Sequence, residues 1–224
     1  MFGLIAYGAD TAPERVIDGL RFRAVRVAAG QGLRAGLSAR AAASALRRAG
    51  VRLALFPPDF PYIPLFVRRG IEPPPLAPLY RAAAPAVVRR YMLRLGIDPR
   101  DAMVAFAAER VTPELMRCVT ALCGEIRYIA LCVPDGGEAF ALALRRAFGV
   151  AARVGTPDAL PPPDLTVVFD ETPVPNRALY LGEGLAVAFD DPRPNALLAL
   201  LHRSGALDAA ALDVESVAPS KIHA

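Results

Sequence analysis

Residues 102 to 170 alternate between short apolar runs and amphipathic segments, and this alternation constrains the fold more than any other feature. Met103–Ala107 and Tyr128–Val133 have the length of strands, and the second is continuously apolar, as is typical of a strand covered on both faces of a sheet. Helices are predicted after them, at 113–123 and 137–148. Because strands that alternate with helices form parallel sheets, the segment predicts an α/β domain.

Both of these helices have start or stop signals. Thr112 is a good N-cap and Pro113 fits the first helical position, while Gly124 and Gly149 stand where helices usually end. Short strands are expected next at 150–154, 165–169, 178–181 and 185–189, and a last helix from Pro194 to His202.

The first 56 residues predict a second, smaller α/β arrangement. A helix is expected from Thr11, because proline and glutamate follow it in the first turn. Another is expected from Ser38, acting as N-cap, to Arg48, with Gly50 just beyond its end. The strands expected around these helices are 4–7, 22–28 and 51–56.

Residues 57 to 79 change in character. Prolines limit regular structure there, but the segment is also rich in Phe, Tyr, Ile and Leu, which favours a packed connector over a loose linker. A helix from Leu79 to Leu95 follows despite Pro85, and Gly96 ends it.

The chain therefore divides into two expected lobes and a tail. Residues 1–78 form an N-terminal α/β lobe with the proline-rich connector, and residues 79–205 form a lobe with a mostly parallel sheet. Residues 206–224 form a tail that is polar enough to fray, although Leu207, Leu212 and Val214 can dock.

Bulk composition points to a cytoplasmic protein of bacterial type. Hydrophobic residues make up 54% of the chain and mean hydropathy is +0.33, yet no run approaches the roughly 20 apolar residues that a spanning helix needs. The N-terminus has no basic residue before its apolar run, unlike a signal peptide. The odd cysteine count, with Cys118, Cys123 and Cys132, favours a reducing compartment.

The net charge of +4 comes almost entirely from arginine. Most arginines occur as pairs among alanines on predicted helices, such as Arg47-Arg48, Arg68-Arg69 and Arg89-Arg90, which is typical of solvated helix faces. Nucleic-acid binding requires a concentrated basic patch. Neither nucleic acid nor membrane is therefore expected as a partner.

Leu79 to Phe169 resembles the helix-then-Rossmann segment of shikimate dehydrogenases and glutamyl-tRNA reductases. Tyr128–Val133 with Gly137–Leu142 is similar to the second strand and helix of that segment, and Leu165–Phe169 is similar to the later strand that closes the site. The resemblance covers under half of the chain and includes no catalytic motif. It implies a Rossmann-like fold, and in the family this fold binds NAD or NADP.

The turn after the first strand departs from the family pattern. Ala107 to Thr112 contains no glycine, whereas the family's glycines let the backbone approach a pyrophosphate and let the helix pack on the sheet. Glu109 would place a carboxylate where the pyrophosphate sits, and the like charges repel. The turn therefore disfavours NAD(P) binding while the resemblance still implies the fold.

In an open parallel sheet, ligands bind beyond the carboxyl ends of the strands. Asp135 falls where the family's ribose-reading acid usually falls, but the turn chemistry around it favours a helix-capping role. Three of the acids could also converge on Mg²⁺, but strand-end acids more often cap helices, so no metal site is assigned. The candidate cofactor-binding residues are Glu109, Arg110, Thr112, Asp135, Gly136, Gly137 and Asp170, and the three acids are Glu109, Asp135 and Asp170.

Several catalytic classes lack their residues. Lys221 is the only lysine, which excludes P-loop and Schiff-base chemistry from the body of the chain. There is no Gly-x-Ser-x-Gly motif, and the histidines, His202 and His223, lack the cysteine spacing of a zinc site. No catalytic residue is assigned.

Three functions stay open. The favoured one is a non-catalytic or divergent Rossmann-like protein that binds a small molecule or a protein partner. The second is an NAD(P)-dependent oxidoreductase with an atypical phosphate turn. The third is an enzyme that depends on carboxylates and a metal. The cofactor and the oligomeric state are unknown from the sequence.

Overall fold

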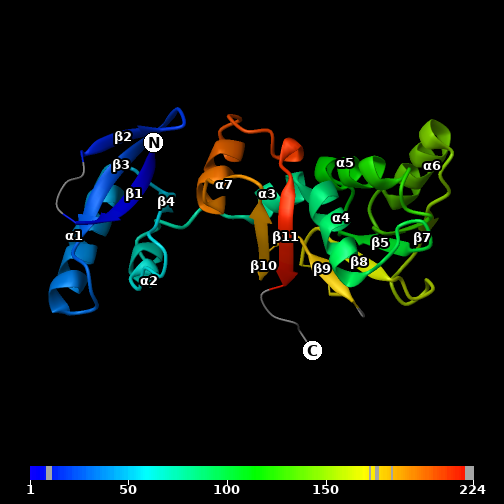
Figure 1. Cartoon of the computed structure of the whole chain (residues 1–224), viewed down its shortest axis with the longest axis horizontal. Coiled ribbons are helices and arrows are strands. Elements are labelled where there is room, and N and C mark those ends of the chain that lie inside the picture. Colours follow the sequence, from blue (N-terminus) through cyan, green and yellow to red (C-terminus); the bar gives the residue numbers. More distant parts are fainter. Residues whose placement is uncertain (9–11, 172, 175–176, 183, 220–224) are drawn as a thin grey trace. The chain divides into compact units, whose positions relative to one another are not determined.

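The computed structural model describes residues 1–8, 12–171, 173–174, 177–182 and 184–219 (Figure 1). Contacts divide the chain into two units, and each is described by itself. Unit 1 comprises Met1–Pro75 and Ala196–Leu207, and unit 2 comprises Leu76–Asn195 and Asp208–Ala224. The sequence predicts residues 196–205 as part of the second lobe, whereas the contacts group this segment with the first.

Unit 1 contains a four-stranded sheet in the order β2-β3-β1-β4. The pairs β3–β1 and β1–β4 are parallel, and β2 pairs with β3 in the antiparallel sense. Leucines of the last long helix, α7 (Asn195–Arg203), pack with Phe22 and Leu55 of this sheet. The other elements are β1 (Phe2–Tyr7), β2 (Glu14–Ile17), β3 (Leu20–Val27), α1 (Leu33–Arg48), β4 (Ala54–Leu55) and α2 (Ile63–Val67).

The helix expected from Thr11 is wrong. Residues 9–11 lie outside the described part of the chain, and Glu14–Ile17 is strand β2, which forms a hairpin with β3. Asp18 and Gly19 both have positive φ, at 48° and 81°. This is the pattern of a type I′ turn, for which Asp-Gly is a preferred sequence. The Asp-Gly pair is thus a stronger local signal than the proline and glutamate before it.

Helix α1 begins at Leu33, five residues before the predicted cap. Its N-cap is Gly32, without a side-chain hydrogen bond. Ser38 lies inside the helix, and its Oγ accepts a hydrogen bond from the Ala28 N–H at 3.1 Å. The helix ends at Arg48 as predicted, followed by Gly50 at a φ of 72°. Small side chains on its buried face allow close packing against β3; they are Ala35, Ala39, Ala42 and Ala43.

The connector is packed, as predicted. Phe60 and Phe66 are buried in the core that α1 covers, and the rings of Phe56 and Phe66 meet edge to face at 5.3 Å between centroids. The short helix α2 within it was not expected. Its aromatic anchors fix a proline-rich segment that has few regular hydrogen bonds of its own.

Unit 2 is built on a five-stranded sheet whose strands are all parallel, in the order β7-β6-β5-β8-β9. This is the Rossmann-like order, in which the chain starts in the middle and moves outward twice. The predicted α/β fold class is confirmed. The elements are α3 (Ala77–Ala82), α4 (Ala84–Leu95), β5 (Met103–Ala107), α5 (Pro113–Leu122), β6 (Tyr128–Cys132), α6 (Gly137–Phe148), β7 (Arg153–Val154), β8 (Leu165–Val168), β9 (Ala178–Tyr180) and β10 (Leu185–Phe189).

The single helix predicted from Leu79 to Leu95 is two helices. Ala83, at φ −86° and ψ 8°, separates α3 from α4, and Pro85 lies at the start of α4. Proline has no N–H to donate and disfavours a helical residue before it, so the break belongs at this point. The end of the helix at Gly96, at a φ of 68°, is confirmed.

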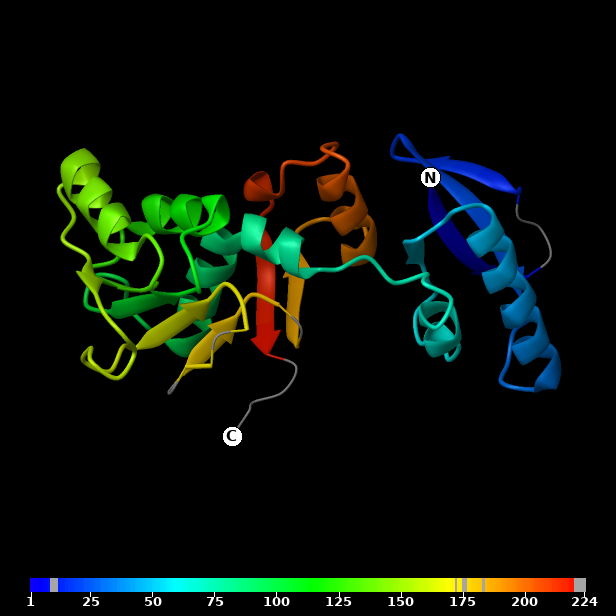
Figure 2. The same cartoon turned by 180° about the vertical axis from the view of Figure 1, so that it is seen from behind.

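Helices cover one face of the parallel sheet and irregular chain covers the other. In both views α5 and α6 lie on the same side of the strands (Figures 1 and 2). Residues 155–164, which link β7 to β8, contain no helix. Leu160 of this loop packs on a sheet face of small side chains that includes Ala105, Ala130 and Cys132. Small residues let the proline-rich loop approach the sheet closely.

The tail does not fray over its described part. Residues 214–219 form β11 (Val214–Pro219), antiparallel to β10, and Leu212 is buried. Arg90 and Arg94 of α4 donate hydrogen bonds to the carbonyl oxygens of Glu215 and Val217 in β11. Residues 220–224 lie outside the described part. No helix among the described residues is long and apolar enough to cross a membrane.

Candidate functional site

The carboxyl ends of β5, β6 and β8 carry most of the residues singled out in the sequence. Arg110, after β5, and Asp135, after β6, form an isolated parallel bridge. The Asp135 N–H donates to the carbonyl oxygen of Glu109 at 3.3 Å, and the Val111 N–H donates to the carbonyl oxygen of Asp135 at 3.0 Å. The two strand-to-helix turns therefore continue the pairing of the strands beyond their ends.

Asp170, after β8, contacts the same turn. Its Oδ2 accepts a hydrogen bond from the Glu109 N–H at 2.5 Å. The Ala108 N–H donates to the carbonyl oxygen of Cys132 at 3.3 Å. With the Val111 amide, three backbone donors of the β5–α5 turn are thus committed to acceptors within the protein. In a dinucleotide-binding turn, such donors face the pyrophosphate.

Thr112 acts as predicted from its capping chemistry. Its Oγ1 accepts a hydrogen bond from the Leu115 N–H at 3.2 Å and caps α5. Glu114 adds a carboxylate in the first turn, where the helix dipole favours negative charge. Thr112 and Glu114 thus supply the hydrogen-bond acceptor and the negative charge that an anionic ligand would otherwise bring to the N-terminus of α5.

The two glycines at the start of α6 differ in what their surroundings require. Gly136, at a φ of 84°, is the N-cap of α6, and a Cβ there would lie 3.3 Å from Cγ2 of Val111. A Cβ on Gly137 would lie 3.4 Å from Cβ of Val133. Position 136 therefore favours glycine, because of its φ and because the two turns approach closely there, whereas the contact at Gly137 is ordinary van der Waals contact. The helix-capping role predicted for Asp135 is wrong in detail, since α6 has no side-chain cap bond and Asp135 contributes through its backbone.

The carboxylates at the strand ends do not form a metal centre. Among the residues that the structure describes, no three His, Cys, Asp or Glu side chains are placed to hold an ion. Asp170 is turned onto the Glu109 amide, and Asp135 is exposed. The described residues therefore give no support to a convergence of Glu109, Asp135 and Asp170 on a cation.

The three cysteines are free thiols, and all are buried. Burial raises the pKa of the thiols of Cys118, Cys123 and Cys132, because a thiolate loses hydration there. They pack as small apolar side chains, as predicted.

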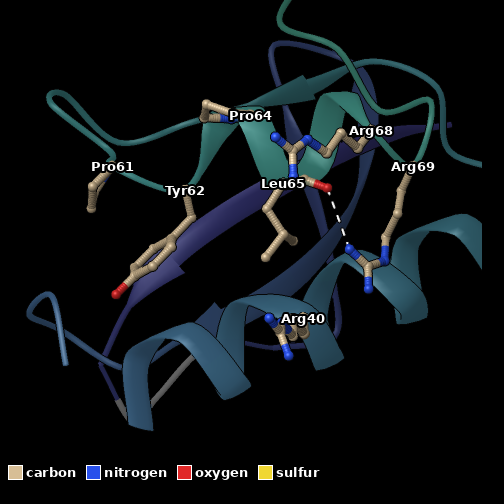
Figure 3. A pocket seen from close by; sticks show the side chains of 7 residues that line it. All are labelled: Arg40, Pro61, Tyr62, Pro64, Leu65, Arg68 and Arg69. Atoms are coloured by element: carbon tan, nitrogen blue, oxygen red, sulfur yellow. Dashed lines mark hydrogen bonds between the residues drawn. The ribbon is translucent and has the colours of Figure 1, made fainter. Parts of the chain in front are cut away.

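A hollow of about 430 Å³ lies in unit 1, on the side of α2 that faces α1 (Figure 3). Arg40 reaches it from α1, and the other lining residues come from α2 and its flanks. The Arg69 Nη1 donates to the carbonyl oxygen of Leu65 at 3.4 Å, and its guanidinium extends toward α1. The hollow is lined by Arg40, Pro61, Tyr62, Pro64, Leu65, Arg68 and Arg69.

Formal charge is distributed very unequally between the two units. Unit 1 carries 12 arginines against 5 acidic residues, a net charge of +7, and it contains the hollow. Unit 2 carries 14 basic against 17 acidic residues, a net charge of −3, and together the units give the +4 of the chain. A charge count for each lobe would have shown this asymmetry from the sequence. The meeting of Arg40 with Arg68 and Arg69 has no local sequence signal.

The similarity of this chain to known proteins is low. No protein-family model and no curated protein matches the sequence. The chain is similar to the solved structure of an Ael1 enzyme from Pseudomonas putida, with 14% identity and a TM-score of 0.29, over 66% of this chain and 58% of that chain. It is also similar to quinate dehydrogenase from Corynebacterium glutamicum in complex with NAD, with 15% identity and a TM-score of 0.29, over 75% and 69%.

The chain thus spans less than two thirds of the length of the Ael1 enzyme. The Rossmann-like assignment of unit 2 stands on its own strand order and agrees with the resemblance found in the sequence.

Proposed function

We propose that this protein is a binding protein for a small molecule or a protein partner, and that its Rossmann-like unit does not take NAD(P) at the β5–α5 turn. One observation carries the proposal: the Asp170 carboxylate occupies the Glu109 N–H, which is a donor that a pyrophosphate would need. The Rossmann-like fold is retained, but backbone N–H groups that would bind the usual ligand donate to acceptors within the protein.

A pyrophosphate at this turn would have to displace Asp170 from the amide of Glu109. It would then lie close to the Asp170 carboxylate, which carries charge of the same sign. Displacing this acceptor forfeits its hydrogen bond, worth about 1 kcal/mol at a half-buried position, before any repulsion between the charges is counted. The contact of the Asp170 carboxylate instead braces the turn after β5 against the turn after β8.

An NAD(P)-dependent oxidoreductase with an atypical phosphate turn is the second candidate. The parallel strand order β7-β6-β5-β8-β9 favours it, because this order creates a crevice at the strand ends. Its cofactor would have to bind without the β5–α5 amides that are committed elsewhere.

Thermal unfolding with NADH and NADPH separates the two candidates. A cofactor at 100 times its dissociation constant stabilises a protein by about 2.7 kcal/mol. We expect that neither NADH nor NADPH stabilises the protein by binding at the β5–α5 turn. This holds for the native protein and for Asp170→Ala. The double variant Arg40→Gln/Arg68→Gln is measured in parallel, because phosphates could also bind the hollow of unit 1. Stabilisation by NADH that persists in this double variant would overturn the proposal.

A further inference from the structure

We infer that the hollow between α1 and α2, where Arg40, Arg68 and Arg69 come together, binds a small organic phosphate. The inference gives a ligand class to the proposed binding role and rests on it. It uses residues remote in sequence from the β5–α5 turn, so the two proposals can fail separately.

Charge in the hollow is of one sign. Three guanidinium groups line it, and no acidic residue does. Within the described chain, no acidic side chain forms an ion pair with Arg40, Arg68 or Arg69. Elsewhere in unit 1, by contrast, Arg23 pairs with Glu14 at 3.4 Å. Like charges gathered without counterions repel one another, and a doubly charged anion would relieve that repulsion.

The chemistry of the side chains favours phosphate. A guanidinium presents a planar fork of donors that matches two phosphate oxygens, and it stays charged at every physiological pH. Arg40 comes from one helix, whereas Arg68 and Arg69 follow another. Donors from two elements can therefore reach different oxygens of one tetrahedral phosphate. A monocarboxylate has two oxygens in one plane and would use fewer of these donors.

The remaining lining favours an organic group on that phosphate. Tyr62 and Leu65, with two prolines, supply aromatic and aliphatic surface beside the guanidinium groups (Figure 3). The volume of about 430 Å³ falls within the range of roughly 300–1,000 Å³ that is usual for small-molecule sites. A nucleic acid would instead need a track of phosphate contacts that extends beyond a hollow of this size.

The walls of the hollow are held in place. The Tyr62 hydroxyl donates to the carbonyl oxygen of Gly30 at 3.4 Å, and Arg69 donates to the carbonyl oxygen of Leu65. Phe66, in the middle of α2, is fully buried in the core. A site built on anchored elements loses little conformational entropy when a ligand binds.

Calorimetric titration of the full chain tests the inference. The probes are phenyl phosphate, inorganic phosphate and phenol, with a short oligothymidylate as the nucleic-acid probe. We expect saturable binding of phenyl phosphate, weaker binding of inorganic phosphate and none of phenol. Arg40→Gln and Arg68→Gln should each weaken phenyl phosphate about tenfold, as expected for loss of one charge-assisted hydrogen bond. Arg68→Lys, which keeps the charge but not the fork, should weaken it less.

Arg34→Gln is the matched control, because Arg34 is exposed on α1 and does not line the hollow. It removes the same charge and should leave the affinity within about twofold. All three positions are exposed, and circular dichroism checks that each variant is folded. Absence of saturable phenyl phosphate binding would overturn the inference. Equal weakening by Arg34→Gln, or binding of the oligothymidylate alone, would also overturn it.

Discussion

The Asp170 carboxylate accepts a hydrogen bond from the backbone N–H of Glu109, across 61 residues of sequence. Glu109 begins the turn after β5 and Asp170 follows β8, and these strands are neighbours in the sheet. The bond ties the two strand ends together at the place where a Rossmann-like fold usually receives its ligand.

Removing this carboxylate should destabilise unit 2. Asp170→Ala leaves the Glu109 amide without this acceptor, and we expect the free energy of unfolding to fall by about 1 kcal/mol, a value reduced because Asp170 is half-buried rather than buried. Asp170→Asn keeps an acceptor oxygen and should cost less. Urea denaturation measures both, with Glu171→Gln on the exposed neighbouring residue as control. Equal stability of native protein and Asp170→Ala would show that the bond contributes nothing.

A methyl group on Gly136 should also destabilise the strand-end turns. Its φ of 84° is unfavourable for alanine, and the new Cβ would lie 3.3 Å from Cγ2 of Val111. Left-handed backbone costs a residue with a Cβ about 1–2 kcal/mol, so Gly136→Ala should lower the unfolding free energy by at least that. Gly124→Ala is the control: its φ lies outside the left-handed region and nothing stands within 4 Å. A loss confined to Gly124→Ala would contradict this account.

The Asp191 carboxylate should stay ionised far into acid. The Arg193 side chain donates to it from Nε at 2.9 Å and from Nη2 at 2.7 Å, and the Arg193 N–H donates at 2.9 Å. These bonds lower the pKa of Asp191 from 3.8 to about 2. A depressed pKa means that the pair stabilises the fold above pH 3.8 and that this stabilisation is lost as the pH falls toward 2.

Carboxyl-carbon NMR of the full chain measures this titration directly. Arg193→Gln should return the midpoint of Asp191 toward 3.8, because the charged donor is gone. An Asp191 midpoint that Arg193→Gln leaves unmoved would contradict the assignment.

Local signals in the sequence account for most of unit 2. The strand Met103–Ala107 and the helix Gly137–Phe148 have the predicted bounds, because apolar runs and terminal glycines or caps mark their ends. In two places a stronger local signal overrides the one that predicts a helix. Asp18-Gly19 fixes a hairpin in place of the helix expected from Thr11, and Pro85 divides the helix expected from Leu79.

The candidate sites needed tertiary information. The sequence predicts that Glu109 and Asp170 follow strands that end at the same edge of the sheet. It does not predict that the Asp170 carboxylate turns onto the backbone N–H of Glu109. Arg40 and Arg68 lie 28 residues apart on segments of unlike composition, and they come to one hollow because the segment around α2, with Phe60 and Phe66, packs into the core that α1 covers. Long-range packing of this kind has no periodic or motif signal in one sequence.

The thiol of Cys132 should report the opening of the loop that covers one face of the unit 2 sheet. Cys132 is 6% exposed and belongs to the cluster against which Leu160 of this loop packs. Because burial raises its thiol pKa and blocks access, reaction with a disulfide reagent in the native protein should be far slower than in guanidinium. Reaction then requires a local opening.

Leu160→Ala should accelerate the labelling of Cys132 selectively. Truncation removes apolar contact from the loop and lowers the free energy of local opening, whereas Cys118, fully buried on α5, should keep its native rate. Leu142→Ala is the control, since Leu142 is 48% exposed. Mass spectrometry of digested, labelled protein resolves the two cysteines. Equal acceleration at Cys118 and Cys132 would indicate that unit 2 unfolds as a whole. It would contradict the prediction that the loop opens on its own.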